Sequence, residues 1–370
     1  MKITFVTQNY LTEKLPHYGA FVVKLVNGLR DLGFEVDVIA PIPVNQYFKH
    51  FHWRKSVIEN VSYPLYLSLG NRFPLLYRLT QFLFYLAVER VFNARPRPDL
   101  IIGKFLFFGG YTAIRLGKKN GLLAYVDLGE SKSLLKQKEL INMVFGSDLS
   151  HASGYFCVSQ RLCSEIYDLG VPDDKIYHFP NSVDRSVFFP NPNKELIRKQ
   201  LGIPKNLGVV CFIGHFIPRK GNLRVLQAIQ MLENISGVFI GGTFNAGTRS
   251  VFFSGHVDHK EIPRWLSASD VFVLPTLSEG HCNVINEAIA CEIPIITSNI
   301  PDIFENIPSE LAILVDPLDV TEIAQEIDIL VNNQKKRESL QKKMRSYNEK
   351  NASYSRSEKI YSILISGLEN

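Results

Sequence analysis

The chain has 370 residues, of which 46% are hydrophobic and 21% are charged, and this is the composition of a globular protein. Its length exceeds what one hydrophobic core usually serves, so two domains are expected. The five cysteines follow no paired spacing, which argues against a disulfide framework and a zinc site. The opening residues lead into a strand-like run without a signal peptide, so we expect a cytoplasmic location.

The net charge of +5 is unevenly distributed along the chain. Residues 1–180 sum to +6, residues 181–370 to −1, and residues 41–140 alone carry +9. This basic segment contains the aromatic and basic run 47–55, which suits anionic lipid headgroups or a phosphate-bearing acceptor. A solvated basic face is an equally weighted interpretation. No nucleic-acid-binding motif accompanies the charge, so no nucleic-acid partner is expected.

Short apolar runs alternate with amphipathic helices in the first half, a pattern typical of a parallel sheet covered on both faces. The predicted strands are Ile3–Thr7, Glu35–Ala40, Asp99–Ile102, Leu122–Val126 and Gly154–Val158, and the first predicted helix is Phe21–Leu32. Residues 73–92 are the most apolar stretch. Arg78, Glu89 and Arg90 interrupt it, so it predicts a buried or membrane-surface helix instead of a membrane span.

A break near residues 180–205, with the linker-like run 188–193, is followed by a second alternating series. Its predicted strands are Leu207–Ile213, Gly237–Ile240, Val271–Leu274 and Ile293–Thr297, and its predicted helices include Asn222–Leu232. We therefore predict two doubly wound α/β domains, residues 1–185 and 186–350. The last helix, within residues 351–370, belongs to either domain, with packing on the N-terminal one as the working choice. Ligands of such sheets bind beyond the carboxyl ends of the strands, which predicts a site in a cleft between the domains.

Two adjacent cations, Arg219 and Lys220, follow the strand that ends at Ile213 and the glycine Gly214. At the mouth of a sheet, an arginine fork and a lysine point charge can neutralise a diphosphate. A solvated basic turn is the simpler interpretation of this pair taken alone.

A polar loop after Leu274 carries Glu279 and leads into a helix that begins near Cys282 or Asn283 and contains Glu287. A helix N-terminus with free N–H groups is a natural seat for phosphate. The two carboxylates would lie on the order of 10 Å apart if both faced a cleft, a separation that suits contacts to different parts of an extended ligand. The alternative is structural: Glu279 caps the helix and Glu287 forms a surface pair.

Taken together, these segments resemble the retaining GT-B glycosyltransferases of family 4, in which two Rossmann-like domains face a central cleft. The family spaces two glutamates by seven residues within a proline-serine-x-x-glutamate-glycine context. The matching residues are Pro275, Thr276, Glu279, Gly280, Glu287, Ala288, Ala290, Cys291 and Pro294. Further similarity covers Arg219–Gly221, Val158–Ser159, Pro180–Asp184 with Phe188 and Pro190, and Ala268–Pro275.

The resemblance implies a nucleoside-diphosphate sugar as the donor, with no metal ion and no other cofactor. It implies that Glu287 binds the donor ribose and that Glu279 contacts the transferred sugar. It also implies that Arg219 and Lys220 hold the diphosphate and stabilise its charge as it leaves. Catalytic roles are thus expected for Glu279, Arg219 and Lys220.

Several further donor contacts are implied at glycines and at the helix start. Gly19 would let the N-terminal domain approach the β-phosphate, and backbone N–H groups near the second helix would bind sugar hydroxyls or phosphate. The implied donor-binding positions besides the charged residues are Gly19, Gly214, Gly280, His281, Cys282 and Asn283. Because the family usually has glycine-phenylalanine-glycine where this chain has Gly280-His281-Cys282, donor choice is expected to be decided there.

The implied reaction is transfer of a hexose-type sugar to a glycan or lipid-linked acceptor in surface polysaccharide or glycoconjugate biosynthesis. Peripheral association with the inner face of an anionic membrane, through residues 41–140, is a further hypothesis. Two alternatives stay open: a catalytically silent partner that binds sugar nucleotide or glycan, and a sugar-nucleotide epimerase of the same architecture.

Overall fold

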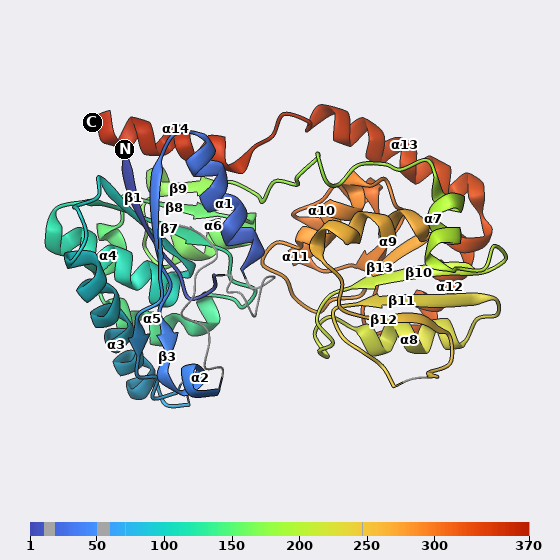
Figure 1. Cartoon of the computed structure of the whole chain (residues 1–370), viewed down its shortest axis with the longest axis horizontal. Helices are drawn as coiled ribbons and strands as arrows, with labels where there is room; N and C mark the ends of the chain where they lie inside the picture. Colours follow the sequence, from blue (N-terminus) through green and yellow to red (C-terminus); the bar gives the residue numbers. More distant parts are fainter. Residues whose placement is uncertain (11–18, 50–59, 71, 246, 370) are drawn as a thin grey trace. The chain divides into compact units, whose positions relative to one another are not determined.

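The computed structural model describes residues 1–370 except 11–18, 50–59, 71, 246 and 370 (Figure 1). The chain forms two compact units, Met1–Asn181 together with Ser355–Asn370, and Ser182–Tyr354. Each unit has its own parallel sheet, so the predicted two-domain α/β fold is confirmed. Most of the aromatic and basic run 47–55 lies outside the described residues.

The first unit is built on a sheet of seven parallel strands within the described residues, in the order β4-β2-β1-β6-β7-β8-β9. In chain order these are β1 (Lys2–Val6), β2 (Glu35–Ile39), β4 (Val61–Ser62), β6 (Leu100–Lys104), β7 (Leu123–Leu128), β8 (Gly154–Cys157) and β9 (Ile176–His178). The short strands β3 (Ile42–Pro43) and β5 (Leu65–Tyr66) pair separately. The helices are α1 (Ala20–Asp31), α2 (Val44–Lys49), α3 (Pro74–Asn93), α4 (Tyr111–Asn120), α5 (Lys138–Phe145), α6 (Gln160–Asp168) and α14 (Arg356–Glu369).

Both faces of the first sheet are buried, which explains why its strands are nearly continuous apolar runs. Successive side chains point to opposite faces, so Ile101 belongs to one core and Ile102 to the other. Helices α3 and α4 contribute to the core around Ile101, whereas α1 and α14 cover the opposite face, where they pack against each other (Figure 1). The last helix of the chain thus completes the core of the first unit.

A buried ion network fastens α14 to the first sheet. The Asp127 carboxylate, at the end of β7, accepts hydrogen bonds from Arg356 at 2.6 Å and from Lys104 at 2.9 Å. Burial favours a higher pKa for Asp127, but the Arg356 and Lys104 charges prevail and hold its pKa below the ordinary value. The Arg356 guanidinium also donates to the Phe179 carbonyl at 2.6 Å, so one side chain joins α14 to two strand ends.

The second unit has a sheet of six parallel strands among the described residues, in the order β12-β11-β10-β13-β14-β15. These are β10 (Gly208–Ile213), β11 (Ile235–Ile240), β12 (Val251–Gly255), β13 (Val271–Leu274), β14 (Ile295–Ser298) and β15 (Ile313–Val315). The helices are α7 (Lys194–Leu201), α8 (Asn222–Gln230), α9 (Ile262–Ala268), α10 (Asn283–Ala290), α11 (Pro301–Phe304), α12 (Val320–Asn332) and α13 (Gln334–Lys350).

The division between the units, after Asn181, lies within the predicted break near residues 180–205, and the rest of that range belongs to the second unit, where helix α7 buries Ile197 in the core. Phe188, inside the run interpreted as a linker, is also buried in that core. The apolar residues Phe188 and Ile197 therefore belong to the hydrophobic core of the second unit. No helix among the described residues has the length and apolar character needed to cross a bilayer.

Replacing Arg356 with methionine is expected to destabilise the first unit by about 3–5 kcal/mol, because Asp127 keeps only Lys104 and the Phe179 carbonyl loses its donor. The pKa of Asp127 lies below its ordinary 3.8, so this contribution is present above pH 3.8 and is lost as pH falls through the lowered value. Hydrogen exchange of the β7 and β8 amides measures the effect. Lys359→Met, at an exposed position of α14, is the control; equal effects of the two variants would contradict the prediction.

Candidate functional site

Two loops of the second unit meet because their strands are neighbours. Strands β10 and β13 pair in parallel, with Cys211 opposite Phe272, so their carboxyl ends lie at the same edge of the sheet. The first loop, residues 214–221, leads from β10 into α8, and the second, residues 275–282, leads from β13 into α10. This edge is where doubly wound sheets bind ligands.

Backbone hydrogen bonds fasten the two loops to each other. The Leu277 N–H donates to the Arg219 carbonyl at 2.8 Å. Arg224, in the first turn of α8, donates to the Pro218 carbonyl at 3.0 Å and to the Pro275 carbonyl at 2.7 Å. One guanidinium thus holds a carbonyl from each loop, as its fork of donors allows.

The close approach of the loops also requires a glycine. Gly221, just before α8, has φ 83°, a left-handed conformation that side chains rarely adopt. A Cβ at this position would lie 2.7 Å from the Pro275 carbonyl oxygen. The glycine therefore serves both the turn into α8 and the contact with the second loop.

The Glu279 carboxylate lies where the two loops meet. Its Oε1 accepts from the Lys220 ammonium at 2.6 Å and the Thr276 hydroxyl at 2.7 Å, and Arg219 Nη1 lies 3.3 Å from it. The Glu279 side chain is only 7% exposed. The structure therefore brings together the three residues predicted to be catalytic, and the N-cap of helix α10 is Cys282 and not Glu279.

Strand β14 and helix α11 support the second loop from the other side. The Asp302 carboxylate accepts from the Glu279 N–H at 2.9 Å, and the Ser298 hydroxyl donates to the Thr276 carbonyl at 2.6 Å. The contributions of Asp302 and Arg224 were not predicted from the sequence, and Thr276 was matched to the motif without a role. The sequence offered one signal for Asp302. It is a polar residue at the start of α11, the helix that follows strand β14, and β14 is the neighbour of β13.

Helix α10 begins at Asn283, as expected, with Cys282 as its N-cap and no side-chain hydrogen bond from that cap. The positive end of the helix dipole is thus at the end of the second loop. The Cys282 side chain is buried, and burial raises the pKa of its thiol to about 12, so it stays protonated at neutral pH. The His281 ring lies 2.8 Å from the Asn286 amide, one turn into the helix.

Glu287 lies in α10, 3.0 Å from the His259 imidazole. Its carboxylate is 13% exposed, and the imidazole is 46% exposed. This contact is the surface pair considered in the sequence analysis. The predicted separation of the Glu279 and Glu287 carboxylates stays a prediction.

Two of the glycines predicted to contact the donor, Gly214 and Gly19, lie in different units. Gly214 directly follows β10, and the Lys220 Cδ would lie 3.7 Å from a Cβ at that position, so Gly214 borders the cation pair. Gly19 is the N-cap of α1 in the first unit, with φ 73°, and a Cβ there would lie 2.3 Å from the Asn9 carbonyl oxygen. Gly280 is buried within the second loop.

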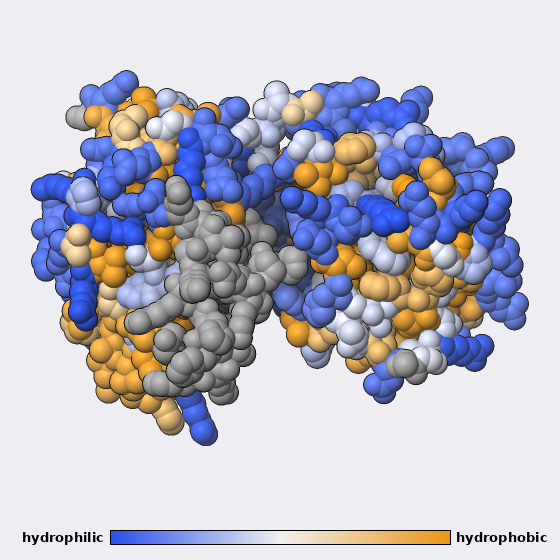
Figure 2. Space-filling view, in the orientation of Figure 1, coloured by the Kyte–Doolittle hydropathy of each residue, from blue (hydrophilic) through white to orange (hydrophobic). Residues whose placement is uncertain are grey.

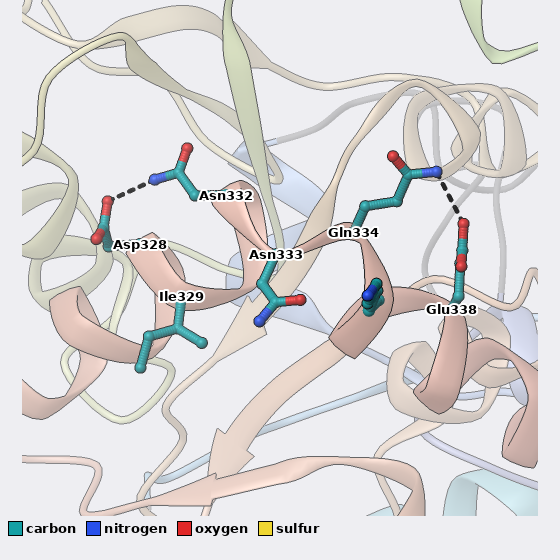
Figure 3. Close-up of a pocket in the computed structure, with 7 residues that line it drawn as sticks. Asp328, Ile329, Asn332, Asn333, Gln334 and Glu338 are labelled. Carbon is teal, nitrogen blue, oxygen red and sulfur yellow. Dashed lines mark hydrogen bonds between the residues drawn. The ribbon is translucent and has the colours of Figure 1, made fainter.

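A separate open pocket lies at the junction of α12 and α13 (Figure 3). Its polar side chains pair locally: Asn332 with Asp328 at 2.8 Å, and Gln334 with Glu338 at 2.8 Å. Such pairs one turn apart are ordinary helix-surface contacts. Across the part of the chain that the structure describes, no group of three or more histidines, cysteines and carboxylates could hold a metal ion.

Two family models match adjacent parts of the chain. "Glycosyltransferase Family 4" matches residues 19–187, and "Glycosyl transferases group 1" matches residues 193–347. TuaC of Bacillus subtilis, a candidate teichuronic acid biosynthesis glycosyltransferase, is 26% identical over 352 residues, 88% of each chain. The N,N'-diacetylbacillosaminyl-diphospho-undecaprenol alpha-1,3-N-acetylgalactosaminyltransferase of Campylobacter jejuni is 26% identical over 348 residues, which are 88% of this chain and 90% of that one.

Solved structures share the fold over almost the whole chain. Sucrose-phosphate synthase from Thermosynechococcus elongatus has a TM-score of 0.77 at 19% identity and covers 99% of this chain and 98% of its own. HepE from Anabaena, in complex with UDP-glucose, has a TM-score of 0.72 at 16% identity and covers 99% of this chain and 100% of its own. At these identities the likeness concerns the fold alone.

Gly221→Ala is expected to weaken the second unit more than Gly202→Ala. Both glycines have left-handed φ, 83° and 72°, which costs alanine about 1 kcal/mol. A Cβ at residue 202 meets open space, whereas one at residue 221 collides with Pro275 and separates the loops. Thermal unfolding of the matched pair measures the difference. Equal melting temperatures would show that the loops do not need this close approach.

Proposed function

The chain belongs to the GT-B glycosyltransferases of family 4, and we propose that it transfers a hexose-type sugar from a nucleoside-diphosphate sugar, with retention of configuration, to a glycan or lipid-linked acceptor. The family and the relatives establish glycosyl transfer in polysaccharide or glycoconjugate biosynthesis. The donor, the acceptor and the stereochemistry are the proposal.

The observation that carries the proposal is the sharing of one buried carboxylate between Lys220 and Arg219. The single negative charge of Glu279 offsets one of the two positive charges, so the cluster of Glu279, Lys220 and Arg219 keeps a net positive charge. A donor diphosphate brings at least as much negative charge to the same place and engages the two cations itself. Glu279 then turns to the hydroxyls of the transferred sugar, to which a carboxylate is a strong acceptor.

Two cations beside a helix N-terminus can stabilise a leaving diphosphate without a divalent ion. In the proposed complex Glu279 accepts from the hydroxyls of the transferred sugar, so this role does not place its carboxylate at the anomeric carbon. We therefore infer that the leaving diphosphate assists the acceptor, which attacks from the same face, and that no covalent sugar–carboxylate intermediate forms.

The acceptor class is proposed from a relative and from charge. The Campylobacter relative acts, by its name, on a sugar linked to undecaprenol diphosphate. In this chain residues 41–140 carry a net charge of +9, which suits an acceptor that bears a diphosphate or an anionic surface that holds one. We propose a lipid-linked acceptor presented at the inner face of a membrane.

Lys220→Met and Arg219→Met are each expected to lower kcat/KM for sugar transfer by about 100- to 1000-fold, because a charged donor to the leaving group is lost. A thermal-shift screen of nucleotide sugars first identifies the donor, since a ligand of the native state raises its stability. Transfer is then assayed with excess EDTA present. Lys260→Met, at an exposed position, is the control.

Glu279→Gln completes this set, because it removes the carboxylate that competes with the diphosphate while it keeps the shape of the side chain. The free nucleoside diphosphate should bind at least as tightly as to the unmodified protein, while transfer falls. Loss of activity in EDTA, restored by added metal, would contradict the role of the cations. Donor binding without turnover on any acceptor would favour the silent partner, and a changed sugar nucleotide formed without acceptor would favour the epimerase.

Glu287→Gln is expected to weaken binding of a nucleoside diphosphate about tenfold, because a carboxylate accepts from ribose hydroxyls more strongly than an amide. The 2′-deoxy form should bind the unmodified protein more weakly than the ribose form. Glu287→Gln should remove much of this difference, and calorimetric titration of both ligands into both proteins completes the cycle. An undiminished difference would place the ribose elsewhere. His259→Gln tests whether the His259 imidazole holds the Glu287 carboxylate in position.

A further inference from the structure

Helix α3 is apolar on two opposite sides, although only one of them is buried. Its buried residues, Thr80, Gln81, Phe84, Tyr85, Val88 and Phe92, face the first unit. On the outer side, Leu75 is 70%, Leu79 43%, Phe82 37% and Leu86 40% exposed. A helix that is hydrophobic all round is normally covered on all sides, so the outer face suits an apolar environment.

The exposed side chains form a continuous stripe, here called the α3 stripe and defined as Leu75, Leu79, Phe82 and Leu86. Their spacing of four, three and four residues places them on one side of a helix. The stripe is about 16 Å long at 1.5 Å per residue. Figure 2 shows an apolar area over the part of the first unit where Figure 1 places α3.

Positive charge borders the α3 stripe. Arg78 and Arg90 are exposed and, at about 100° per residue, lie about 60° to either side of the middle of the stripe. The Arg115 guanidinium, from α4, lies 5.9 Å from the centre of the Phe82 ring. Glu89, the acid of α3, is engaged by Lys119 at 2.8 Å and by the Tyr85 hydroxyl.

The exposed apolar side chains and the bordering arginines together favour one of two binding partners for the α3 stripe, a second copy of the chain or an anionic bilayer. A second copy of the chain would bring Arg78 and Arg90 of two stripes together, while the Glu89 carboxylates are already engaged. An anionic bilayer offers acyl chains to the apolar side chains and lipid phosphates to the arginines, as interfacial amphipathic helices require. Since α3 cannot cross a bilayer, the contact is confined to the surface.

We propose that the α3 stripe inserts into the headgroup region of an anionic membrane, with Arg78 and Arg90 at the lipid phosphates. This inference rests on the proposed function, because a lipid-linked acceptor never leaves the bilayer and the enzyme has to come to it. The stripe gives the first unit a fixed depth and orientation at that surface.

The test is sedimentation of the full-length protein with vesicles of phosphatidylcholine, with and without about one third phosphatidylglycerol, at low salt. The unmodified protein should bind the anionic vesicles. Leu75→Ser/Leu79→Ser should lower the partition coefficient at least tenfold, and Arg78→Gln/Arg90→Gln should remove the preference for phosphatidylglycerol. Leu318→Ser, which changes a side chain 65% exposed in the second unit, is the matched control.

Circular dichroism and thermal unfolding show whether each variant is folded. Absence of binding by the unmodified protein, or equal binding by the leucine variant, would overturn the proposal. A dimer of the unmodified protein that dissociates in the leucine variant, without vesicle binding, would assign the stripe to a second copy. The vesicles contain neither donor nor acceptor, so this outcome is independent of the nucleotide and transfer experiments that test the proposed function.

Discussion

The site in the second unit depends on the Glu279 carboxylate. It is buried, and it is shared by Lys220, Arg219 and the Thr276 hydroxyl, which come from two loops. A buried carboxylate without cations would be costly, and so would two adjacent cations without a carboxylate. In the proposed function, the charges that hold these two loops together are also the charges that engage the donor diphosphate. If the proposed donor binds there, ligand binding and the arrangement of the two loops are coupled through this one carboxylate.

The rest of the second loop is held by contacts to backbone atoms. Arg224, Asp302 and Ser298 each bond a carbonyl or an N–H of the loop, from α8, α11 and β14. Their effect is to fix where the Glu279 side chain begins, because a carboxylate on a free loop would not stay with its cations. The sheet sets the distance between the loops, and these three side chains set their conformation.

The sequence predicted the elements that leave a local pattern and missed several contacts between residues that are distant in the chain. The run Val209–Ile213 is continuously apolar and buried, so its strand was evident, whereas β12 is only partly buried except at Gly255 and lacked that signature. Glu279, Lys220 and Arg219 each follow a predicted strand, and the family resemblance implied that all three serve one donor site. The roles of Asp302 and Arg224 were missed, because a bond to a distant backbone group leaves no periodic pattern. Phe188 was assigned to a linker because its turn-like neighbours hide a core residue.

The position of α14 has a consequence for synthesis. The ribosome makes residues 1–181 first, then the whole second unit, and only then Arg356 and the helix that covers one face of the first sheet. Domains fold as units while the chain emerges. The second unit therefore has all its residues when the first still lacks the guanidinium that pairs with Asp127. During synthesis the first unit is therefore the first to emerge from the ribosome and the last to be complete.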